Sequence, residues 1–326
     1  MILSWNVTKK CNLSCRHCYR DAGERDPDEL NTSEAKELIL EIRGAGFNIL
    51  ILSGGEPLLR KDIYELITFA SGVGLRPVLG TNGTLIDENA ARELKRSGLA
   101  CAGISVDSLD PEVHDDFRKI KGAWMRTMNG IEACRKEGLD FQVHTTVTRS
   151  NHEGINRITE FAADSGARAH HVFFLVPVGR ASAINDLLLS TGEYQCLVTA
   201  LAREQKKSRI EIKAVCAPQF SALSIREKIE TRFKKGCLAG ISYCCILPNG
   251  DVHPCPYMHI KAGNTRQIPF SRMWKESPIF NELRTRSYKG ICGTCEYGQS
   301  CGGCRARAFH WTGDHMHEDP FCFIGA

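Results

Sequence analysis

The sequence predicts an α/β protein in which six strand–helix units precede a small cysteine-rich domain. Short apolar runs alternate with amphipathic runs from Met1 to about Arg180. Such alternation is typical of parallel strands joined by right-handed crossovers. The chain has 326 residues, which is too many for one small core, and nine of its 16 cysteines lie from Cys237 onward. We therefore expect a core at residues 1–190, a bridging segment at 191–235 and a C-terminal domain at 236–326.

The apolar runs predict strands, and the amphipathic runs between them predict helices. The expected strands are Ile2–Val7, Asn48–Leu52, Arg76–Leu79, Gly103–Val106, Phe141–Val147 and His171–Val176. The expected helices are Ser33–Arg43, Ile63–Gly72, Glu88–Ser97, Ala123–Glu137 and Glu153–Asp164. Asp62 and Asp87 lie near helix starts, where a carboxylate can accept hydrogen bonds from free N–H groups. Further along, we expect one helix at Glu193–Lys206 and one short strand at Ile210–Ala214.

Composition argues against several classes of protein. Apolar residues make up 42% of the chain and charged residues 25%, which is ordinary for a globular protein. No apolar run approaches membrane-spanning length, and the first ten residues contain no signal-peptide apolar region. The net charge of +4 is spread along the chain, so we expect no nucleic-acid partner and allow an anionic small substrate. We expect a cytoplasmic protein with no membrane partner, whose clustered cysteines bind metal.

Three cysteines near the start form the most informative motif. Cys11, Cys15 and Cys18 lie in CNLSCRHCY with the spacing C-x3-C-x2-C, in the loop after the first expected strand. Three thiolates can hold three irons of a [4Fe–4S] cube and leave the fourth iron open for chemistry. Zinc is the alternative, but zinc prefers four closed ligands and commonly uses C-x2-C pairs. The spacing, followed by the aromatic Tyr19, favours a cluster loop.

Polar motifs follow the next three strands. Gly54-Gly55-Glu56-Pro57 follows the second strand, Thr81-Asn82-Gly83 ends the third, and Ser105 and Asp107 end the fourth. In parallel α/β folds, ligands bind at the carboxyl ends of the strands. Glycines let the backbone approach a ligand closely, and a glutamate can accept a hydrogen bond from an ammonium group. The alternatives are ordinary turns for the glycine motifs and a helix cap for Asp107.

The triad and these motifs resemble the signature of the radical S-adenosylmethionine (SAM) enzymes. The resemblance implies a partial (β/α)6 barrel and a [4Fe–4S] cluster on which SAM is cleaved to methionine and a 5′-deoxyadenosyl radical. That radical takes a hydrogen atom from an unactivated C–H bond, while the protein positions the substrate and excludes water. An iron–sulfur electron carrier, the non-enzymatic alternative, would not explain GGEP. The SAM-contact residues implied are Tyr19, Gly54, Gly55, Glu56, Pro57, Thr81, Asn82, Ser105, Asp107 and Arg118.

The C-terminal segment contains more cysteines than one [4Fe–4S] cube needs. They resemble the SPASM extension of this family, which carries auxiliary [4Fe–4S] clusters, although Cys301 and Cys304 stand one residue closer together than its pattern. The resemblance implies one cube on Cys292, Cys295, Cys301 and Cys322. It implies another on Cys237, Cys255, Cys304 and either Cys245, our first choice, or Cys244. Zinc remains the alternative because C-x2-C pairs are common to both kinds of site. Cys216 is expected to face either the substrate or a cluster, or to be a buried thiol.

Nearly the whole chain resembles the haem-biosynthesis branch of the radical SAM family. The resemblance lies in SWNVTKKCNLSCRHCYRDAG, ILSGGEPLLR, HHVFFLVPVGR, CAPQF, GDVHPCPY and CGGCRARA. It implies an enzyme that modifies carboxylate side chains of an iron tetrapyrrole. We expect removal of acetate chains from 12,18-didecarboxysirohaem to give Fe-coproporphyrin III. The alternatives are oxidative decarboxylation of Fe-coproporphyrin III to haem b, a step of haem d1 formation, or a maturase that acts on a peptide or protein.

A tetrapyrrole substrate would need partners for its carboxylates and its iron. Arginine suits carboxylates, and the candidates are Arg180, Arg305 and Arg307, with ordinary surface arginines as the alternative. The candidates for ligating iron or donating a proton are His144, His170 and His171, with satisfied core histidines as the alternative. Reduction of the first cluster would also require a low-potential electron donor of the ferredoxin or flavodoxin type.

Overall fold

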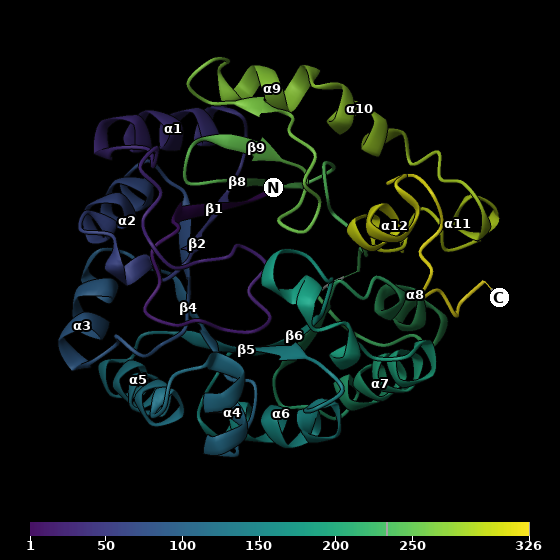
Figure 1. Ribbon diagram of the computed structural model, residues 1–326, viewed down its shortest axis with the longest axis horizontal. Coiled ribbons are helices and arrows are strands. Elements are labelled where there is room, and N and C mark those ends of the chain that lie inside the picture. Colours follow the sequence, from purple (N-terminus) through teal and green to yellow (C-terminus); the bar gives the residue numbers. More distant parts are fainter. Residues whose placement is uncertain (233, 326) are drawn as a thin grey trace.

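The computed structural model describes residues 1–232 and 234–325, so Phe233 and Ala326 of the predicted segments lie outside the described residues. Within the described residues the strands form one ten-stranded sheet in the order β10-β9-β8-β1-β2-β3-β4-β5-β6-β7. Figure 1 shows the helices around the outside of these strands. The strands are β1 Ile2–Thr8, β2 Ile49–Gly54, β3 Arg76–Thr81, β4 Cys101–Ser105, β5 Phe141–Val147, β6 Ala169–Phe174, β7 Glu211–Val215, β8 Tyr243–Ile246, β9 Asp251–His253 and β10 Gly263–Asn264.

Helices follow the barrel strands and cover their outer face. In α1, Ala35, Leu38, Ile39 and Ile42 are buried, and this 3.6-residue spacing turns one apolar face towards the sheet. The helices are α1 Thr32–Gly44, α2 Ile63–Gly72, α3 Glu88–Arg96, α4 Pro111–Arg118, α5 Ala123–Glu137, α6 Ile155–Asp164, α7 Thr191–Gln205, α8 Gln219–Arg226, α9 Phe270–Glu276, α10 Pro278–Thr285, α11 Ile291–Thr294 and α12 Arg305–Thr312. Short 3-10 turns span Pro57–Leu59, His152–Gly154, Gly179–Ala183 and Asn185–Leu187.

The parallel α/β architecture predicted from the sequence is confirmed. Every neighbouring pair from β8 through β1 to β7 is parallel, and only β9 and β10 join the sheet in antiparallel fashion. Asp87 caps α3 by accepting a hydrogen bond from Ala90 N at 2.7 Å, as expected. The predicted cap by Asp62 is wrong, because that carboxylate is engaged by Arg60 and Thr32 instead. No helix within the described ranges has the length and apolar character needed to cross a bilayer.

Later segments of the chain extend the barrel sheet at both ends. Strand β7, from the bridging segment, pairs with β6, while β8, from the cysteine-rich segment, pairs with β1. Figure 1 shows α12 next to α8, and Arg307 on α12 donates a hydrogen bond to Tyr194 on α7, so α12 lies next to the last elements of the barrel. The pairing of β1 with β8 sets Ile2 opposite Tyr243, which are 241 positions apart in the chain. The boundaries 1–190, 191–235 and 236–326 stay a prediction, since the sheet runs across all three segments.

Candidate active site

The cysteine loop, residues 9–19, follows β1 and brings its three thiols to one cavity. Each sulfur accepts a hydrogen bond: Cys11 from Leu13 N at 3.4 Å, Cys18 from Ala22 N at 3.4 Å and Cys15 from Arg118 Nη1 at 3.7 Å. Such donors stabilise the thiolate, which is the form that binds iron. Burial, with smaller contributions from nearby Glu56, Cys15 and Cys18, raises the pKa of Cys11 to about 11. Bound iron would reverse this shift, because a cation favours the thiolate.

The GGEP loop packs directly on the cysteine loop. Gly55 N donates a hydrogen bond to Thr8 O, and Glu56 N donates one to Lys10 O, each at 2.8 Å. A Cβ on Gly55 would lie 2.2 Å from Lys10 O. Gly54 has a φ of +131°, and a Cβ there would lie 2.3 Å from Thr8 O. The two glycines therefore allow the backbone contact that sets the shape of the cysteine loop.

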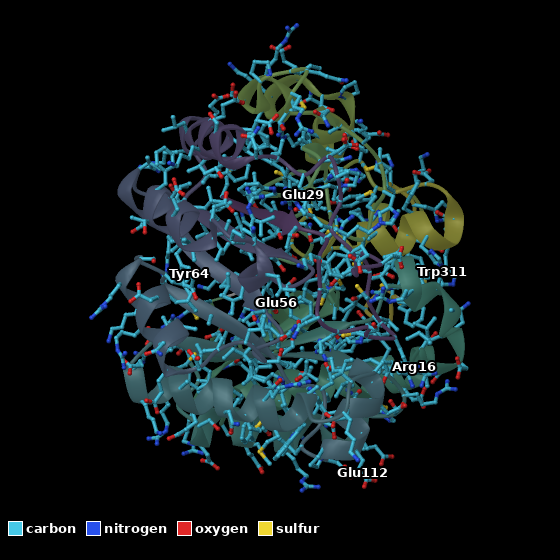
Figure 2. The ribbon with its side chains drawn as sticks, turned by 60° about the vertical axis from the view of Figure 1, so that its left-hand side comes forward. Arg16, Glu29, Glu56, Tyr64, Glu112 and Trp311 are labelled. Carbon is cyan, nitrogen blue, oxygen red and sulfur yellow. The ribbon has the colours of Figure 1, made fainter. Side chains whose placement is uncertain are left out.

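Glu56 lies behind the cavity wall instead of in it. Its side chain is fully buried, and Figure 2 labels it near the centre of the view, with the exposed Trp311 towards the edge. The carboxylate accepts hydrogen bonds from Thr81 Oγ1 and Asn82 N, each at 2.9 Å. Burial raises its pKa to about 7. The sequence predicts SAM contacts for Glu56 and Pro57, but neither lines the cavity; here Glu56 holds the turn that follows β3.

That turn is also tied to the cysteine loop through side chains. Asn82 Nδ2 donates a hydrogen bond to Asn12 Oδ1 at 2.9 Å, and Asn12 Nδ2 donates one to Thr84 Oγ1 at 2.9 Å. Thr84 Oγ1 in turn donates to Asn82 Oδ1 at 2.6 Å. Asn12 lies between Cys11 and Cys15 and was not singled out from the sequence. Thr81 and Asn82 line the cavity, as do Gly54, Gly55 and Tyr19.

Asp107 and Arg118 form a buried ion pair with 2.6 Å between Oδ2 and Nη2. Asp107 Oδ1 also accepts a hydrogen bond from Thr146 N at 2.9 Å, and Asp107 does not line the cavity. In this structure Asp107 holds Arg118 beside Cys15, and its predicted SAM contact stays a prediction. The Arg118 guanidinium keeps the pKa of Asp107 below its usual value despite burial. Arg118 and Ser105 both line the cavity, which agrees with their predicted positions.

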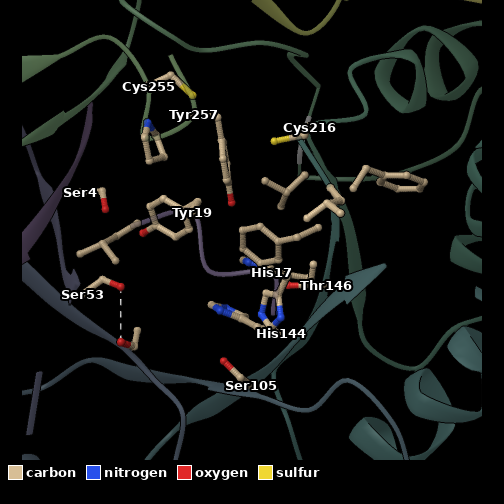
Figure 3. A pocket seen from close by; sticks show the side chains of 18 of the residues that line it. Ser4, His17, Tyr19, Ser53, Ser105, His144, Thr146, Cys216, Cys255 and Tyr257 are labelled. Atoms are coloured by element: carbon tan, nitrogen blue, oxygen red, sulfur yellow. Dashed lines mark hydrogen bonds between the residues drawn. The ribbon is translucent and has the colours of Figure 1, made fainter. Parts of the chain in front are cut away.

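The thiols, the glycine loops and the barrel wall enclose one cavity of about 410 Å³. The cysteine loop and the ends of β2 and β3 form one side, and β4 to β7 form another. Figure 3 shows Ser105 and His144 in one part of this cavity, and Cys216, Cys255 and Tyr257 in another. Cys237 and Cys304 also line it. The cavity therefore extends from the first cysteine motif to the C-terminal cysteines.

Four of the C-terminal cysteines surround a second, smaller cavity. Its lining includes Cys292, Cys295, Cys301 and Cys322, which is the set implied by the SPASM resemblance. Gly303 has a φ of +57°, and a Cβ there would lie 3.1 Å from Cys292 Sγ. Arg305 Nη2 donates a hydrogen bond to the same sulfur at 3.6 Å. Glycine is thus needed where the backbone passes the thiols, and the donor set suits a thiolate-ligated cluster.

The remaining C-terminal cysteines divide into two groups. Cys237, Cys255 and Cys304 are neighbours; burial raises the pKa of Cys255, and the thiols of Cys237, Cys304 and Cys245 raise it as well. Cys244 points into the hydrophobic core from the other face of β8. Cys245 accepts a hydrogen bond from Asn6 Nδ2 at 3.0 Å. Within residues 1–232 and 234–325, no three His, Cys, Asp or Glu side chains are arranged around a single metal ion.

Comparison with known proteins identifies the family. The Radical SAM superfamily pattern matches residues 5–162, and an iron-sulfur cluster-binding domain (SPASM) matches residues 237–302. An AdoMet-dependent heme synthase of Nitratidesulfovibrio vulgaris is 40% identical over 98% of this chain and 91% of its own. That of Methanosarcina barkeri is 41% identical, over 98% and 95%. The chain belongs to the radical SAM superfamily.

Two further matches have a lower sequence identity to this chain. An Fe-coproporphyrin III synthase of Methanosarcina barkeri is 30% identical over 99% of this chain and 88% of its own. The crystal structure of Streptococcus suis SuiB bound to S-adenosylmethionine matches with a TM-score of 0.79. It is 18% identical and covers 99% of this chain and 77% of the SuiB chain, so it supports the fold alone. The cofactors of this radical SAM enzyme are accordingly SAM and [4Fe–4S] clusters.

The residues fit these cofactors, and the protein itself holds the cysteine loop in place and limits the access of water. When bound, the first cluster and SAM supply a carbon-centred radical that can take a hydrogen atom from an unreactive C–H bond. Arg118 and the backbone N–H groups stabilise the three thiolates, and the GGEP loop fixes the cysteine loop. The largely apolar lining of the cavity limits access of water. The individual SAM contacts stay predictions.

The arginines proposed for substrate carboxylates have structural partners in this radical SAM enzyme. Arg307 pairs with Asp319 at 2.7 Å, and Arg305 donates to the carbonyl oxygen atoms of His315 and His317. Neither guanidinium lines the cavity, and both residues are only 1% exposed. Arg180 lines the cavity, but its donors bind Cys15 O at 3.0 Å and Ala22 O at 2.7 Å. These geometries assign all three arginines to holding the cluster-bearing loops.

The three candidate histidines lie in two different environments, the core and the cavity. His170 is fully buried between Thr145 Oγ1 at 2.9 Å and Thr159 Oγ1 at 2.8 Å, so it is a satisfied core histidine. His144 and His171 line the cavity with their rings stacked at 5.0 Å between centroids. Burial lowers the pKa of His144 to about 3, so its ring is neutral at pH 7. His144 Nε2 finds no hydrogen-bond partner among the residues that the structure describes.

Strand register places the two cavity histidines in a polar row. Ser105 on β4 pairs with His144 on β5, His144 pairs with His171 on β6, and His171 pairs with Lys213 on β7. All four side chains line the cavity. Burial lowers the pKa of Lys213 to about 8, so the ammonium is still charged at pH 7. The sequence did not single out Lys213, because only the pairing of β6 with β7 places it in the site.

Proposed function

We propose that this radical SAM enzyme is a haem synthase that converts two propionate side chains of Fe-coproporphyrin III into the vinyl groups of haem b. The observation that carries the proposal is a difference in similarity. Identity is 40–41% to two AdoMet-dependent heme synthases, against 30% to an Fe-coproporphyrin III synthase, each over nearly the whole chain. From its motifs alone the chain is expected to remove acetate groups; the graded similarity favours the oxidative alternative within the same branch.

The reaction balances with the groups that the enzyme offers. Each propionate, –CH2–CH2–COO⁻, gives up one hydrogen atom from the carbon next to the ring. It then loses CO2 and one electron to become –CH=CH2. The hydrogen atom goes to the cofactor-derived radical, and the electron goes to an iron–sulfur cluster. The C-terminal clusters are suited to accept it, because Cys255 and Cys304 line the same cavity as the SAM-binding cysteines.

The polar row supports a carboxylate substrate. Lys213 brings a positive charge into a cavity whose lining is mostly apolar, and a substrate carboxylate would pair with it there. Neutral His144 and His171 are neighbours in the polar row and can donate hydrogen bonds to the same anion. The row lies across β4 to β7, whereas the three SAM-cluster thiols lie on the loop after β1. We propose that a propionate anchored on this row is held towards the SAM site.

The proposal includes an external partner. Reduction of the SAM-binding cluster requires a low-potential electron donor of the ferredoxin or flavodoxin type. The electron released from each propionate is available to return to such a donor through the C-terminal clusters. A predicted cytoplasmic location is consistent with a donor of this kind.

Substrate competition tests the proposal directly. The anaerobically reconstituted full chain is incubated with SAM, a low-potential reductant and equal amounts of Fe-coproporphyrin III and 12,18-didecarboxysirohaem. We expect Fe-coproporphyrin III to be consumed and haem b to appear, with about two molecules of 5′-deoxyadenosine per haem. Mass spectrometry of the tetrapyrroles follows both substrates at once.

Each contrary result identifies a different function. Consumption of didecarboxysirohaem alone would select the acetate-removing reaction. Abortive formation of 5′-deoxyadenosine with neither tetrapyrrole consumed would contradict the whole haem-synthesis proposal. A control with Cys15→Ala should form neither 5′-deoxyadenosine nor product, because the first cluster would lose one of its three thiolates.

A further inference from the structure

Cys216 occupies a strained position where the barrel meets the cysteine-rich segment. It follows β7 directly and has a φ of +60°, a left-handed conformation that residues with a side chain rarely adopt. Such conformations persist where the surrounding structure enforces them, and they cluster at functional sites. Its side chain lines the main cavity together with Cys237, Cys255 and Cys304. Figure 3 shows Cys216 and Cys255 with their sulfur atoms in the same part of that cavity.

The thiol of Cys216 contacts the auxiliary cysteines. It is hydrogen-bonded to the thiol of Cys304. Cys237 and Cys255 also lie near the Cys304 thiol, and all four residues line the same cavity. Cys304 is therefore the common neighbour of the other three thiols. Four thiols that converge in this way are what a cube requires, one for each iron.

A buried ion pair holds Cys216 and Cys304 next to each other. Arg307, on α12, donates hydrogen bonds to both oxygen atoms of Asp319 at 2.7 Å. The same guanidinium donates to Cys216 O at 2.9 Å, and Asp319 Oδ2 accepts a hydrogen bond from Cys304 N at 2.8 Å. Gln219 Nε2 donates to Asp319 Oδ2 at 3.0 Å. The pair thus binds the backbone of both cysteines, although they are 88 positions apart in the sequence.

The two cysteines implied by family resemblance are placed differently. Cys244 belongs to the hydrophobic core on the far face of β8. Cys245 faces the barrel, where Asn6 Nδ2 donates to its sulfur at 3.0 Å and Arg20 Nη2 at 3.6 Å. These contacts hold the Cys245 thiol beside β1. Neither cysteine shows the direct thiol contact with Cys304 that Cys216 makes.

We propose that Cys216 is the fourth ligand of the auxiliary cluster held by Cys237, Cys255 and Cys304, and that Cys245 is not a ligand. This inference concerns cofactor binding and does not depend on the proposed substrate. A cube with four protein thiolates has no open iron, so this cluster would transfer electrons and would not bind substrate directly. It would lie at the wall of the substrate cavity, in position to accept an electron from a bound molecule.

The test isolates the auxiliary clusters in the full chain. Cys11, Cys15 and Cys18 are all replaced by alanine, which removes the first cluster, and the protein is reconstituted under anaerobic conditions. Cys216→Ala, Cys245→Ala and Cys196→Ala are then compared in this background. Cys196 is an exposed thiol on α7 and serves as the matched control. The measurements are iron and sulfide per chain and the electron paramagnetic resonance (EPR) spectrum after reduction.

We expect Cys216→Ala to lose about half of the iron and sulfide, one cube of two. Cys245→Ala and Cys196→Ala should keep the full content and the parental spectrum. Full content and an unchanged spectrum in Cys216→Ala would overturn the proposal, as would loss of a cluster in Cys245→Ala, or zinc in place of iron.

A second variant decides the case if Cys216→Ala does not fold. Cys216→Ser keeps the size of the side chain and offers an oxygen ligand in place of sulfur. If Cys216 binds iron, this variant should retain a cluster whose EPR spectrum and reduction potential are both shifted. A parental spectrum and potential in Cys216→Ser would show that the side chain does not bind iron.

Discussion

Lys213 is the residue on which recognition of a substrate carboxylate depends most. In Lys213→Met, the apolar side chain should raise the KM for Fe-coproporphyrin III roughly ten- to hundredfold, because a charge-assisted hydrogen bond is lost. SAM cleavage in the absence of substrate should be unchanged. Lys207→Met is the matched control, since the side chain of Lys207 is 75% exposed. Steady-state kinetics would contradict the assignment if both variants kept the parental KM.

The pKa of Lys213 predicts how binding changes with pH. Burial lowers this pKa to about 8, so the ammonium is charged below pH 8 and loses its proton as the pH rises above it. Burial holds the pKa values of His144 and His171, which face it from β5 and β6, below the usual range, so both stay neutral here, while Cys216 follows directly after β7.

The KM for Fe-coproporphyrin III should therefore be flat from pH 7 to about 8 and rise above that value. Lys213→Arg should remove the rise, because a guanidinium stays charged in this range. Measurements of KM between pH 7 and 9 check both expectations. A rise of equal size in Lys213→Arg would place the titrating group elsewhere.

Sequence spacing revealed those site residues that act as a local motif. The cysteines of C-x3-C-x2-C and the GGEP loop are recognisable within a few positions, and the three cysteines and the two glycines line the cavity. Asn12 and Lys213 escaped notice because their roles depend on partners far along the chain, Asn82 and the β6 strand. Glu56 was recognised, but its burial could not be foreseen. A motif shows which residues matter, and the three-dimensional packing decides what each one contacts.

Among the elements, the contact between the GGEP loop and the cysteine loop is the most sensitive. In Gly55→Ala, the added Cβ would meet Lys10 O at 2.2 Å, so the two loops must separate. We expect this variant to lose most of its 5′-deoxyadenosine formation and to bind less iron at the first cluster. Gly44→Ala is the control, because nothing lies within 4 Å of its Cβ position. Iron content equal to that of the control would argue against the proposed packing.

The ion pair of Arg307 and Asp319 fixes the helix α12 to the end of β7. Asp319→Asn leaves the Arg307 charge buried without its carboxylate, which should lower the free energy of unfolding by about 3–5 kcal/mol. Asp140→Asn, which removes an exposed partner of Arg168, should cost less than about 1 kcal/mol. Urea unfolding of the anaerobic proteins compares the two. Similar losses in both variants would mean that the buried pair contributes little.

Elements with strong periodicity were predictable, and short ones were not. The helix Ala123–Glu137 has the predicted bounds, since its apolar spacing and its C-terminal Gly138 mark both the face and the end. Helix α4 was missed although Asp110 and Pro111 provide a cap and a first helical residue. Strands β8 to β10 are two to four residues long and lie among cysteines, so no alternation could reveal them. The pairing of β8 with β1, on which β9 and β10 build, depends on contacts across the whole chain.

At the scale of the whole molecule, one sheet connects the two cysteine-rich regions. Strand β1 leads into the SAM-cluster loop and also pairs with β8, which precedes Cys255. Strand β7 carries Lys213 and ends at Val215, directly before Cys216. The substrate cavity therefore lies between the proposed source of the radical and the proposed electron acceptor. This geometry suits a reaction that removes both a hydrogen atom and an electron from one side chain.

Isotope transfer tests this two-centre chemistry most directly. Fe-coproporphyrin III carrying deuterium on the propionate carbon next to the ring is incubated with the reconstituted enzyme, SAM and reductant under anaerobic conditions. We predict that deuterium appears in 5′-deoxyadenosine while haem b forms. Haem b with unlabelled 5′-deoxyadenosine, or labelled substrate recovered intact after SAM has been cleaved, would contradict hydrogen abstraction from the propionate in this cavity.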